Sequence, residues 1–219
     1  MILKAEKVLF PTNDYPTSDG KPMAETDLHR KLMAAVIDTL EHHFAADPGV
    51  YVSGNLLVFY EKGDKRVHVS PDVFVVRGVA KGLRPNYLLW KERPLDLVIE
   101  LTSKTTMTED IEEKYNLYVE KLGVKEYFLF DPEEDYLNPS FQGCRKVRGK
   151  FRPIKPAGGR LPSDVLKLHL ERDGTQLRLW NPVTGERLPT PAERAADAEA
   201  EVERLRRELE QLRGKPGGK

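Results

Sequence analysis

The heptapeptide LDLVIEL, residues 95–101, is a nearly continuous apolar run that contains only two acidic residues. A short apolar run without polar alternation is typical of a central strand that is buried on both faces. The segment that follows, residues 108–122, has apolar residues at helical spacing and ends before Gly123. Residues 125–130, KEYFLF, then form a second strand candidate. A strand, a crossover helix and a neighbouring strand predict an α/β (α+β) protein with a mixed sheet flanked by helices.

The sequence before this unit predicts one long helix and a pair of strands. Residues 24–46 carry apolar residues about four positions apart, and Thr26 or Asp27 could cap the resulting helix. Residues 51–59 and 67–76 are strand candidates that we expect to pair antiparallel through the Gly63-Asp64 turn. After the unit, four strand candidates separated by turn sequences in residues 139–188 predict added antiparallel hairpins.

The C-terminal sequence differs in composition from the rest of the chain. We expect one globular domain over residues 1–188, a coiled-coil helix over 189–213 and a disordered tail over 214–219. Within the helix, apolar residues recur at alternating spacings of three and four, which is a heptad pattern. This pattern predicts a parallel homodimer through residues 194–213, although packing of the helix onto its own chain stays open. The a and d positions are Ala195, Val202, Leu209 and Ala198, Leu205, Leu212.

Charge, cysteine content and hydropathy limit the classes of function. The 219 residues include 35 basic and 35 acidic ones, so net charge neither supports nor excludes a nucleic-acid partner. A basic strip over residues 145–152 is either a solvated hairpin or a phosphate contact. Cys144 is the only cysteine, which excludes an internal disulfide and indicates a structural thiol. The sequence has no apolar run long enough for a membrane span, so we expect a soluble, cytoplasmic protein without a membrane partner.

Two acidic residues lie in apolar strand sequence, where a carboxylate is costly unless it is paired. Asp72 follows Ser70-Pro71 and precedes four apolar residues, and Glu100 lies within the 95–101 run. Two carboxylates in adjacent strands could share a divalent cation such as Mg²⁺ or Mn²⁺. The alternative is that each carboxylate pairs with a lysine or arginine, and the pattern alone leaves both interpretations open.

Several motifs around these carboxylates together resemble a known family. They are VSGNLLVFYEKGD at residues 52–64, the Pro71-Asp72 pair, and IELTSKTTMTEDIEEKYNLYVEKLGVKEYFLFDP at residues 99–132. This combination resembles the Uma-type family of restriction endonucleases, which belongs to the PD-(D/E)xK nuclease superfamily. The resemblance covers roughly residues 20 to 170 and implies a restriction-endonuclease-like core, a divalent metal and DNA as substrate.

The resemblance also implies roles for individual residues. Asp72, Glu100 and the main-chain carbonyl of Leu101 would hold Mg²⁺ or Mn²⁺, and Lys114 would orient the attacking water or stabilise the phosphate. The usual lysine of the superfamily lies two residues after the glutamate, where this chain has Thr102. Lys114 therefore fits a migrated lysine, and Lys104 is its rival.

The first predicted helix supplies one further candidate. Glu25 begins this helix, in a region where the superfamily often has an acidic residue near the metal, so Glu25 is a possible additional site residue. His29, one helical turn later, is interpreted as a surface neighbour, and the other four histidines have no metal-binding spacing.

The sequence is compatible with two functions of different classes. The first is a metal-dependent endonuclease that hydrolyses DNA phosphodiester bonds through a metal-activated water. The second is a catalytically inactive nuclease-fold module that binds nucleic acid or assembles through its C-terminal coiled coil. The sequence contains neither a phosphate-binding G-x-x-x-x-G-K or G-x-G-x-x-G loop nor a G-x-S-x-G elbow, which disfavours an NTPase, a dinucleotide enzyme and an esterase.

Overall fold

The computed structural model describes residues 13–18, 20, 26–102 and 113–214. It divides into two compact units, Met1–Leu188 and Pro189–Lys219, which are treated separately below. Within the described ranges, every helix is too short or too polar to cross a membrane.

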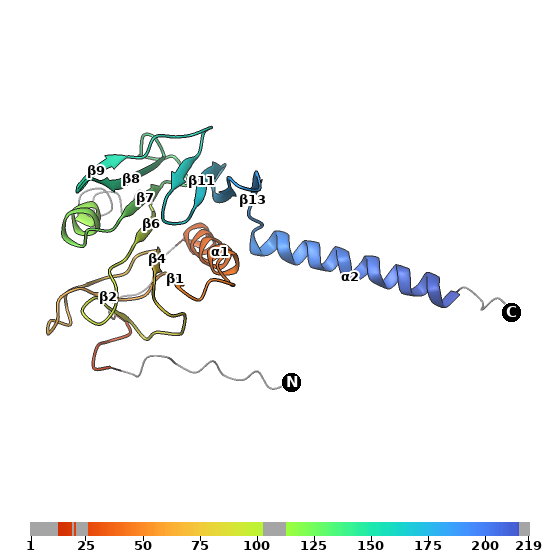
Figure 1. Ribbon diagram of the computed structural model, residues 1–219, viewed down its shortest axis with the longest axis horizontal. Coiled ribbons are helices and arrows are strands. Elements are labelled where there is room, and N and C mark those ends of the chain that lie inside the picture. The colour runs from red at the N-terminus through yellow and green to blue at the C-terminus, as the bar shows by residue number, and fades with distance from the viewer. Residues whose placement is uncertain (1–12, 19, 21–25, 103–112, 215–219) are drawn as a thin grey trace. The chain divides into compact units, whose positions relative to one another are not determined.

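A six-stranded mixed sheet forms the centre of the first unit, as Figure 1 shows. The apolar run gives β6, Leu97–Leu101, in which every residue is buried. β6 pairs antiparallel with β4, Val73–Arg77, and parallel with β7, Glu126–Phe130. The predicted central strand and its parallel neighbour are therefore confirmed. The full order is β1-β4-β6-β7-β8-β9, in which β1 is Val50–Ser53, β8 is Phe141–Val147 and β9 is Lys150–Pro153.

The crossover between β6 and β7 ends in a helical segment, η2, Asn116–Lys121. This segment is a π-helix, and the Leu122 N–H donates to the Leu117 carbonyl at 2.8 Å. The prediction of an α-helix over residues 108–122 is thus wrong in helix type, because the described part is wound as a π-helix. Residues 108–112 lie outside the described residues. A π-helix has i→i+5 hydrogen bonds and is found frequently at functional sites.

The first helix, α1, spans Asp27–His43 and is confirmed. Thr26 is its N-cap, because the Thr26 side chain accepts a hydrogen bond from the His29 N–H at 3.2 Å. The buried face of α1 packs on the main sheet and includes Leu32, Val36 and Leu40.

The hairpin predicted for residues 51–59 and 67–76 is divided between two sheets. β1 pairs with β4 in the main sheet, whereas β2, Val58–Phe59, pairs with β3, His68–Val69, in a three-stranded sheet. β5, Tyr87–Leu88, joins β2 in parallel. The predicted antiparallel pairing is therefore confirmed, but each predicted strand divides into two, because the chain crosses from one sheet to the other at Gly54 and Pro71.

The predicted C-terminal hairpins are confirmed, but they belong to two sheets. β8 and β9 extend the main sheet, while β10, Leu161–Ser163, β11, Leu168–Asp173, β12, Gln176–Asn181, and β13, Glu186–Arg187, form a four-stranded sheet. One of the four strand candidates, VLKLHL at residues 165–170, is a strand only from Leu168 onward. A turn precedes it, in which the Lys167 N–H donates to the Ser163 carbonyl at 3.0 Å.

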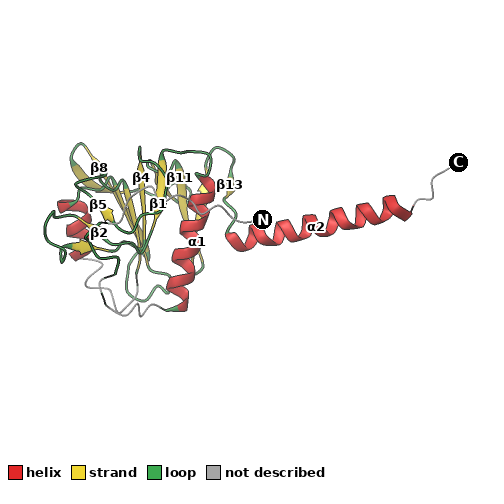
Figure 2. Ribbon diagram, turned by 90° about the horizontal axis from the view of Figure 1, so that it is seen from below, coloured by secondary structure: helices red, strands yellow, loops and turns green. Residues whose placement is uncertain are grey.

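The main sheet is covered on both faces, as Figures 1 and 2 show. α1 and apolar residues of β10, β11 and β12 bury one face, including Val73, Ile99 and Phe128. η2, through Tyr118, and residues of the three-stranded sheet bury the other face, which includes Phe74 and Val98. Because side chains alternate along a strand, even-numbered residues of β4 and β6 point towards η2.

The second unit consists of one helix, α2, Pro191–Gly214. Thr190 and Glu193 form a reciprocal cap, in which the Thr190 N–H donates to Glu193 at 2.7 Å and the Glu193 N–H donates to Thr190 at 3.2 Å. Its large apolar side chains are exposed within this unit: Val202, Leu205, Leu209 and Leu212.

Candidate active site

The strand register places Asp72 opposite Glu100. The last registered pair of β4 and β6 is Val73↔Ile99, and Asp72 and Glu100 are the next residues outward on the two strands. Residues that face each other across an antiparallel pair lie on one face, with Cβ atoms about 4.5–5.5 Å apart. Asp72 directly precedes β4 rather than lying inside it, which corrects the sequence-based placement. Both carboxylates are therefore at one edge of the sheet, on the face that η2 covers.

Asp72 is held by two groups from different elements. Its Oδ2 accepts a hydrogen bond from the Leu101 main-chain N–H at 2.8 Å, and His29 Nε2 lies 3.1 Å from the same oxygen. The Asp72 and His29 side chains are 13% and 15% exposed. Because an ionised carboxylate can only accept, His29 must donate from Nε2. His29 is therefore not a mere surface neighbour, and sequence reasoning missed its contact with Asp72.

Glu100 is fully buried and forms an ion pair with Lys114. The Lys114 Nζ lies 3.0 Å from Glu100 Oε2, and the Lys114 side chain is 18% exposed. A buried carboxylate without a cation would carry a large desolvation cost, so this amine stabilises the charge of Glu100. The lysine pairing that the sequence left open as a structural explanation is thus present, and it involves the lysine that the family resemblance selects.

Tyr118 closes the site from η2. Its side chain is completely buried, and burial, together with the adjacent Glu100 carboxylate, raises the pKa of its hydroxyl well above the usual value of 10.0. Tyr118 is therefore a neutral hydroxyl beside the carboxylates.

Thr102, at the position of the usual lysine, has a role within the sheet. It is 1% exposed, its N–H donates to the Phe130 carbonyl at 2.8 Å, and its hydroxyl lies 3.5 Å from that oxygen. The only candidate amine that the described residues bring to Glu100 is that of Lys114. Lys104 and Glu25 lie outside the described residues.

The oxygen atoms at this edge suit a hard divalent cation. Asp72 and Glu100 provide carboxylates, and the Leu101 N–H points towards Asp72. In an extended strand the N–H and C=O of one residue point to the same side, so the Leu101 carbonyl points to the side of β6 on which β4 lies. Within the described ranges no group of three or more His, Cys, Asp or Glu side chains could hold a metal. An ion at this site would therefore depend on two carboxylates, a main-chain oxygen and water, a set typical of Mg²⁺.

Comparison with known proteins identifies the family. The model of the Uma2 family, described as "Putative restriction endonuclease", matches residues 11–173. The chain belongs to the Uma2 family. A crystal structure of a "putative nuclease belonging to DUF820" from Anabaena variabilis resembles this Uma2-family chain with 17% identity and a TM-score of 0.45, covering 69% of this chain and 80% of the other. No curated protein matches the chain.

The residues of the basic strip at 145–152 in this Uma2-family chain differ in their contacts. Arg145 is engaged in the fold, since it pairs with Asp164 and lies 3.3 Å from Glu126. Lys150 and Arg152 on β9 are exposed. The expected solvated hairpin with alternating charges therefore describes part of the strip, and β9 keeps exposed cations.

Proposed function

We propose that this Uma2-family protein is a divalent-metal-dependent endonuclease that hydrolyses phosphodiester bonds of DNA. The observation that carries the proposal is the ion pair of Lys114 with the fully buried Glu100, directly opposite Asp72. A purely structural ion pair would not require a second carboxylate in register beside it. Buried charges that meet at one end of adjacent strands are a common feature of active sites.

Each residue has a role in this proposal. Asp72, Glu100 and the Leu101 carbonyl would hold Mg²⁺ or Mn²⁺, which when bound makes water more acidic and neutralises charge that develops on the phosphate. Lys114 would donate to the attacking water or to a phosphate oxygen, because its amine is held at the carboxylates. The Leu101 N–H and His29 would fix the orientation of Asp72. Water attacks phosphorus and loses a proton to solvent, while the opposite P–O bond breaks and its leaving oxygen takes up a proton from solvent to become a hydroxyl.

Plasmid cleavage tests the proposal. We expect purified protein to nick supercoiled plasmid or cut single-stranded DNA with Mg²⁺ or Mn²⁺, and to do neither with chelator. Asp72→Asn and Glu100→Gln should each abolish cleavage, while Asp135→Asn, at an exposed site, should not. Circular dichroism of each variant separates loss of chemistry from loss of fold. Metal-independent cleavage, or full activity of both site variants, would overturn the assignment.

The second candidate is a catalytically inactive nuclease-fold module that binds nucleic acid or assembles. Thr102 in the usual lysine position and the balanced charge favour it. An inactive module would bind DNA without metal or self-associate, and it would not nick plasmid under any metal condition. The same plasmid assay therefore decides between the nuclease and the inactive module.

We also propose the domain organisation that supports either function. Residues 1–188 form the nuclease domain, residues 189–213 form a coiled-coil helix that pairs two chains in parallel, and residues 214–219 form a tail. Complementary charges beside the apolar heptad positions of α2 support this pairing, as argued below.

A further inference from the structure

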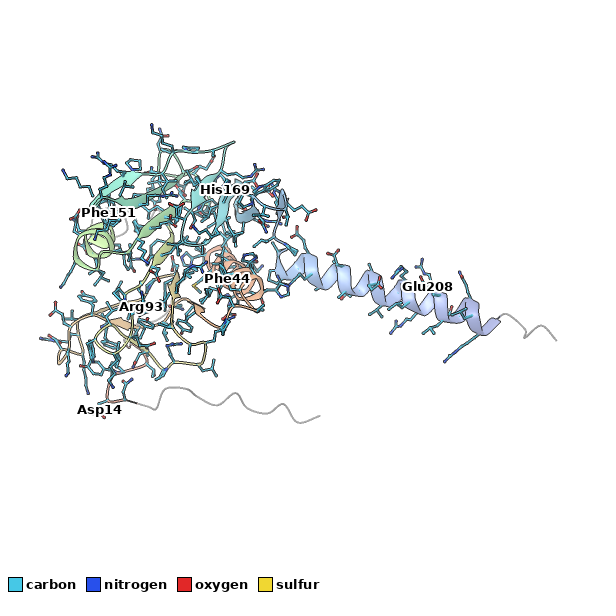
Figure 3. The ribbon with its side chains drawn as sticks, viewed as in Figure 1. Asp14, Phe44, Arg93, Phe151, His169 and Glu208 are labelled. Carbon is cyan, nitrogen blue, oxygen red and sulfur yellow. The ribbon has the colours of Figure 1, made fainter. Side chains whose placement is uncertain are left out.

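A cavity of about 330 Å³ is lined by residues of β7, β8 and β9 and by Tyr115, which directly precedes η2. Aromatic and polar side chains share its lining, which includes Tyr115, Leu129, Phe141, Gln142, Phe151 and Arg152. Phe151 lies on β9 next to η2, as Figure 3 shows. The mixture of flat apolar surfaces and a few polar groups is typical of a small-ligand site.

The strand register connects this cavity to the candidate active site. Glu100 pairs with Leu129 across β6 and β7, and Leu129 pairs with Gln142 across β7 and β8. Gln142 is therefore two strands from Glu100 along one row of the sheet, about 10 Å away at the usual strand spacing. On the helical side, Tyr115 directly follows Lys114. A DNA strand bound at Glu100 and Lys114 would bring a neighbouring nucleotide to the cavity.

The lining matches the chemistry of a nucleobase. Tyr115, Phe141 and Phe151 are each partly exposed. The Phe141 ring packs on Phe128 and Phe130, so Tyr115 and Phe151 are the rings that we expect to stack on a base. The Gln142 amide is oriented by donation from Nε2 to the Pro139 carbonyl at 2.9 Å. Arg152 adds hydrogen-bond donors on exposed β9. Stacking on aromatic rings beside a cationic surface is the usual way in which proteins hold unpaired bases.

Cys144 also lines this cavity, but its thiol adds no charge to it. Burial raises the pKa of its thiol to about 11, with a smaller contribution from Glu126. The thiol is therefore neutral at physiological pH and contributes an apolar surface.

We propose that this cavity receives one unpaired base of the DNA strand whose phosphate lies at Asp72, Glu100 and Lys114. The proposal rests on the proposed nuclease function and names its substrate more closely, as single-stranded DNA or a base that is displaced from a duplex. A fully paired base cannot enter the cavity, because its edge and both faces are occupied by neighbouring bases.

Binding without hydrolysis tests this inference. Fluorescence anisotropy in chelator would measure the affinity of a labelled single-stranded oligonucleotide and of versions in which one abasic site is moved along the strand. We expect one abasic position to weaken binding by about 5- to 150-fold, the range that stacking of one base represents. Phe151→Ala should weaken the intact strand similarly and remove the sensitivity to that abasic position. Phe151→Trp should restore it, and Tyr60→Ala, which changes a partly exposed aromatic that directly follows β2 in another sheet, should have no effect.

The outcomes separate this inference from the nuclease function. Base-dependent binding without cleavage would leave the cavity assignment standing and overturn the nuclease. Cleavage that is insensitive to abasic sites and to Phe151→Ala would overturn the cavity assignment alone. Photocrosslinking of unmodified protein to an oligonucleotide with one 5-iododeoxyuridine avoids reliance on a variant that fails to fold. Crosslinks to Tyr115, Phe141 or Phe151 are expected, and crosslinks confined to other elements would contradict the proposal.

Discussion

At the scale of single residues, the orientation of Asp72 depends on two donors to one oxygen. The Leu101 N–H belongs to the neighbouring strand, whereas His29 comes from the first turn of α1 on the other side of the sheet. Both donors act on Oδ2 and so fix the plane of the carboxylate. Partners of this kind orient metal ligands, and their loss typically reduces metal affinity or activity about 10- to 100-fold.

His29→Ala should therefore raise the Mn²⁺ concentration that half-saturates cleavage by about 10- to 100-fold. His29→Gln should recover part of the loss, because its amide can donate to Asp72. His42→Ala, an exposed histidine on the same helix, is the control and should be silent. An unchanged Mn²⁺ dependence in His29→Ala would remove His29 from the site.

Lys114 is predicted to act in cleavage more than in metal binding. Lys114→Ala should lower the cleavage rate by about 10²- to 10³-fold, as loss of one donor to a developing charge does in other enzymes. Mn²⁺ binding, measured by calorimetry, should persist. Lys121→Ala is the matched control, because Lys121 lies on η2 but pairs with the exposed Glu61. If Lys104→Ala is inactive while Lys114→Ala cleaves, the catalytic lysine is misassigned.

Cys144 gives a pH-dependent prediction that requires no substrate. Burial raises the folded pKa from 9.0 to about 11, so the folded thiol stays protonated where the unfolded thiol is already ionised. The alkylation rate of folded protein by iodoacetamide should keep rising up to about pH 11, whereas that of urea-unfolded protein should level off above about pH 9. Equal profiles would show that the thiol is not buried.

Sequence could indicate Asp72, Glu100 and Lys114 because each conflicts with its apolar surroundings or matches a family motif. It could not indicate the contact of His29 with Asp72. Those residues are 43 positions apart in sequence and on opposite sides of the sheet, and only the packing of α1 brings them together. The position of His29 one helical turn after Glu25 is the available signal, and from sequence alone it indicates only a surface neighbour.

At the scale of elements, the crossing of the chain at Gly54 determines where Asp72 lies. An added Cβ at Gly54 would be 1.9 Å from the Asp72 main-chain oxygen and 2.7 Å from the Ile37 side chain. The next residue, Asn55, donates its N–H to the Pro71 carbonyl at 2.8 Å. Only glycine permits this approach of two backbones, which also explains why the predicted hairpin divides into two sheets. Apolar periodicity cannot reveal such a crossing, because the strands on both sides of it are equally apolar.

Gly54→Ala should therefore displace Asp72 and destabilise the fold by about 1–3 kcal/mol, the usual cost of overpacking. Cleavage should fall further than the loss of folded protein explains. Gly49→Ala is the control, because a Cβ there meets Asp47 at 3.4 Å, an ordinary contact. Thermal unfolding with a parallel cleavage assay checks both variants. A Gly54→Ala protein with wild-type stability and activity would contradict this account of the crossing.

Other elements were predictable for a definite physical reason. β6 and β7 are buried on both faces, so their sequences are apolar at every position except Glu100 and Glu126 and do not alternate as amphipathic strands do. The π-winding of η2 was not predictable, because its apolar residues fit an α-helix equally well. The π-helical backbone nevertheless brings the side chains of Lys114 and Tyr118 next to Glu100.

At the scale of the whole molecule, α2 is a 24-residue helix whose apolar side chains have no cover within its own unit. An isolated helix of this kind is marginal in water and gains stability mainly from packing. Its heptad seam has Arg194, Glu201 and Glu208 at g positions, which would face Glu199, Arg206 and Arg213 at e positions of a parallel partner. All three pairs are opposite in charge. In the single chain, Arg204 instead pairs with Glu201 and Glu208 along the helix.

We therefore expect full-length protein to be a dimer by light scattering and a chain that ends at Pro189 to be a monomer. Leu205→Glu places a charge at the centre of the seam and should give a monomer, because a buried carboxylate without a partner is costly. Gln211→Glu adds the same charge at an outer position and should leave the dimer intact. If two nuclease centres act on one duplex, the truncated chain should still nick plasmid but lose double-strand breaks. Equal masses for the full-length and truncated chains would show that α2 does not pair the molecules.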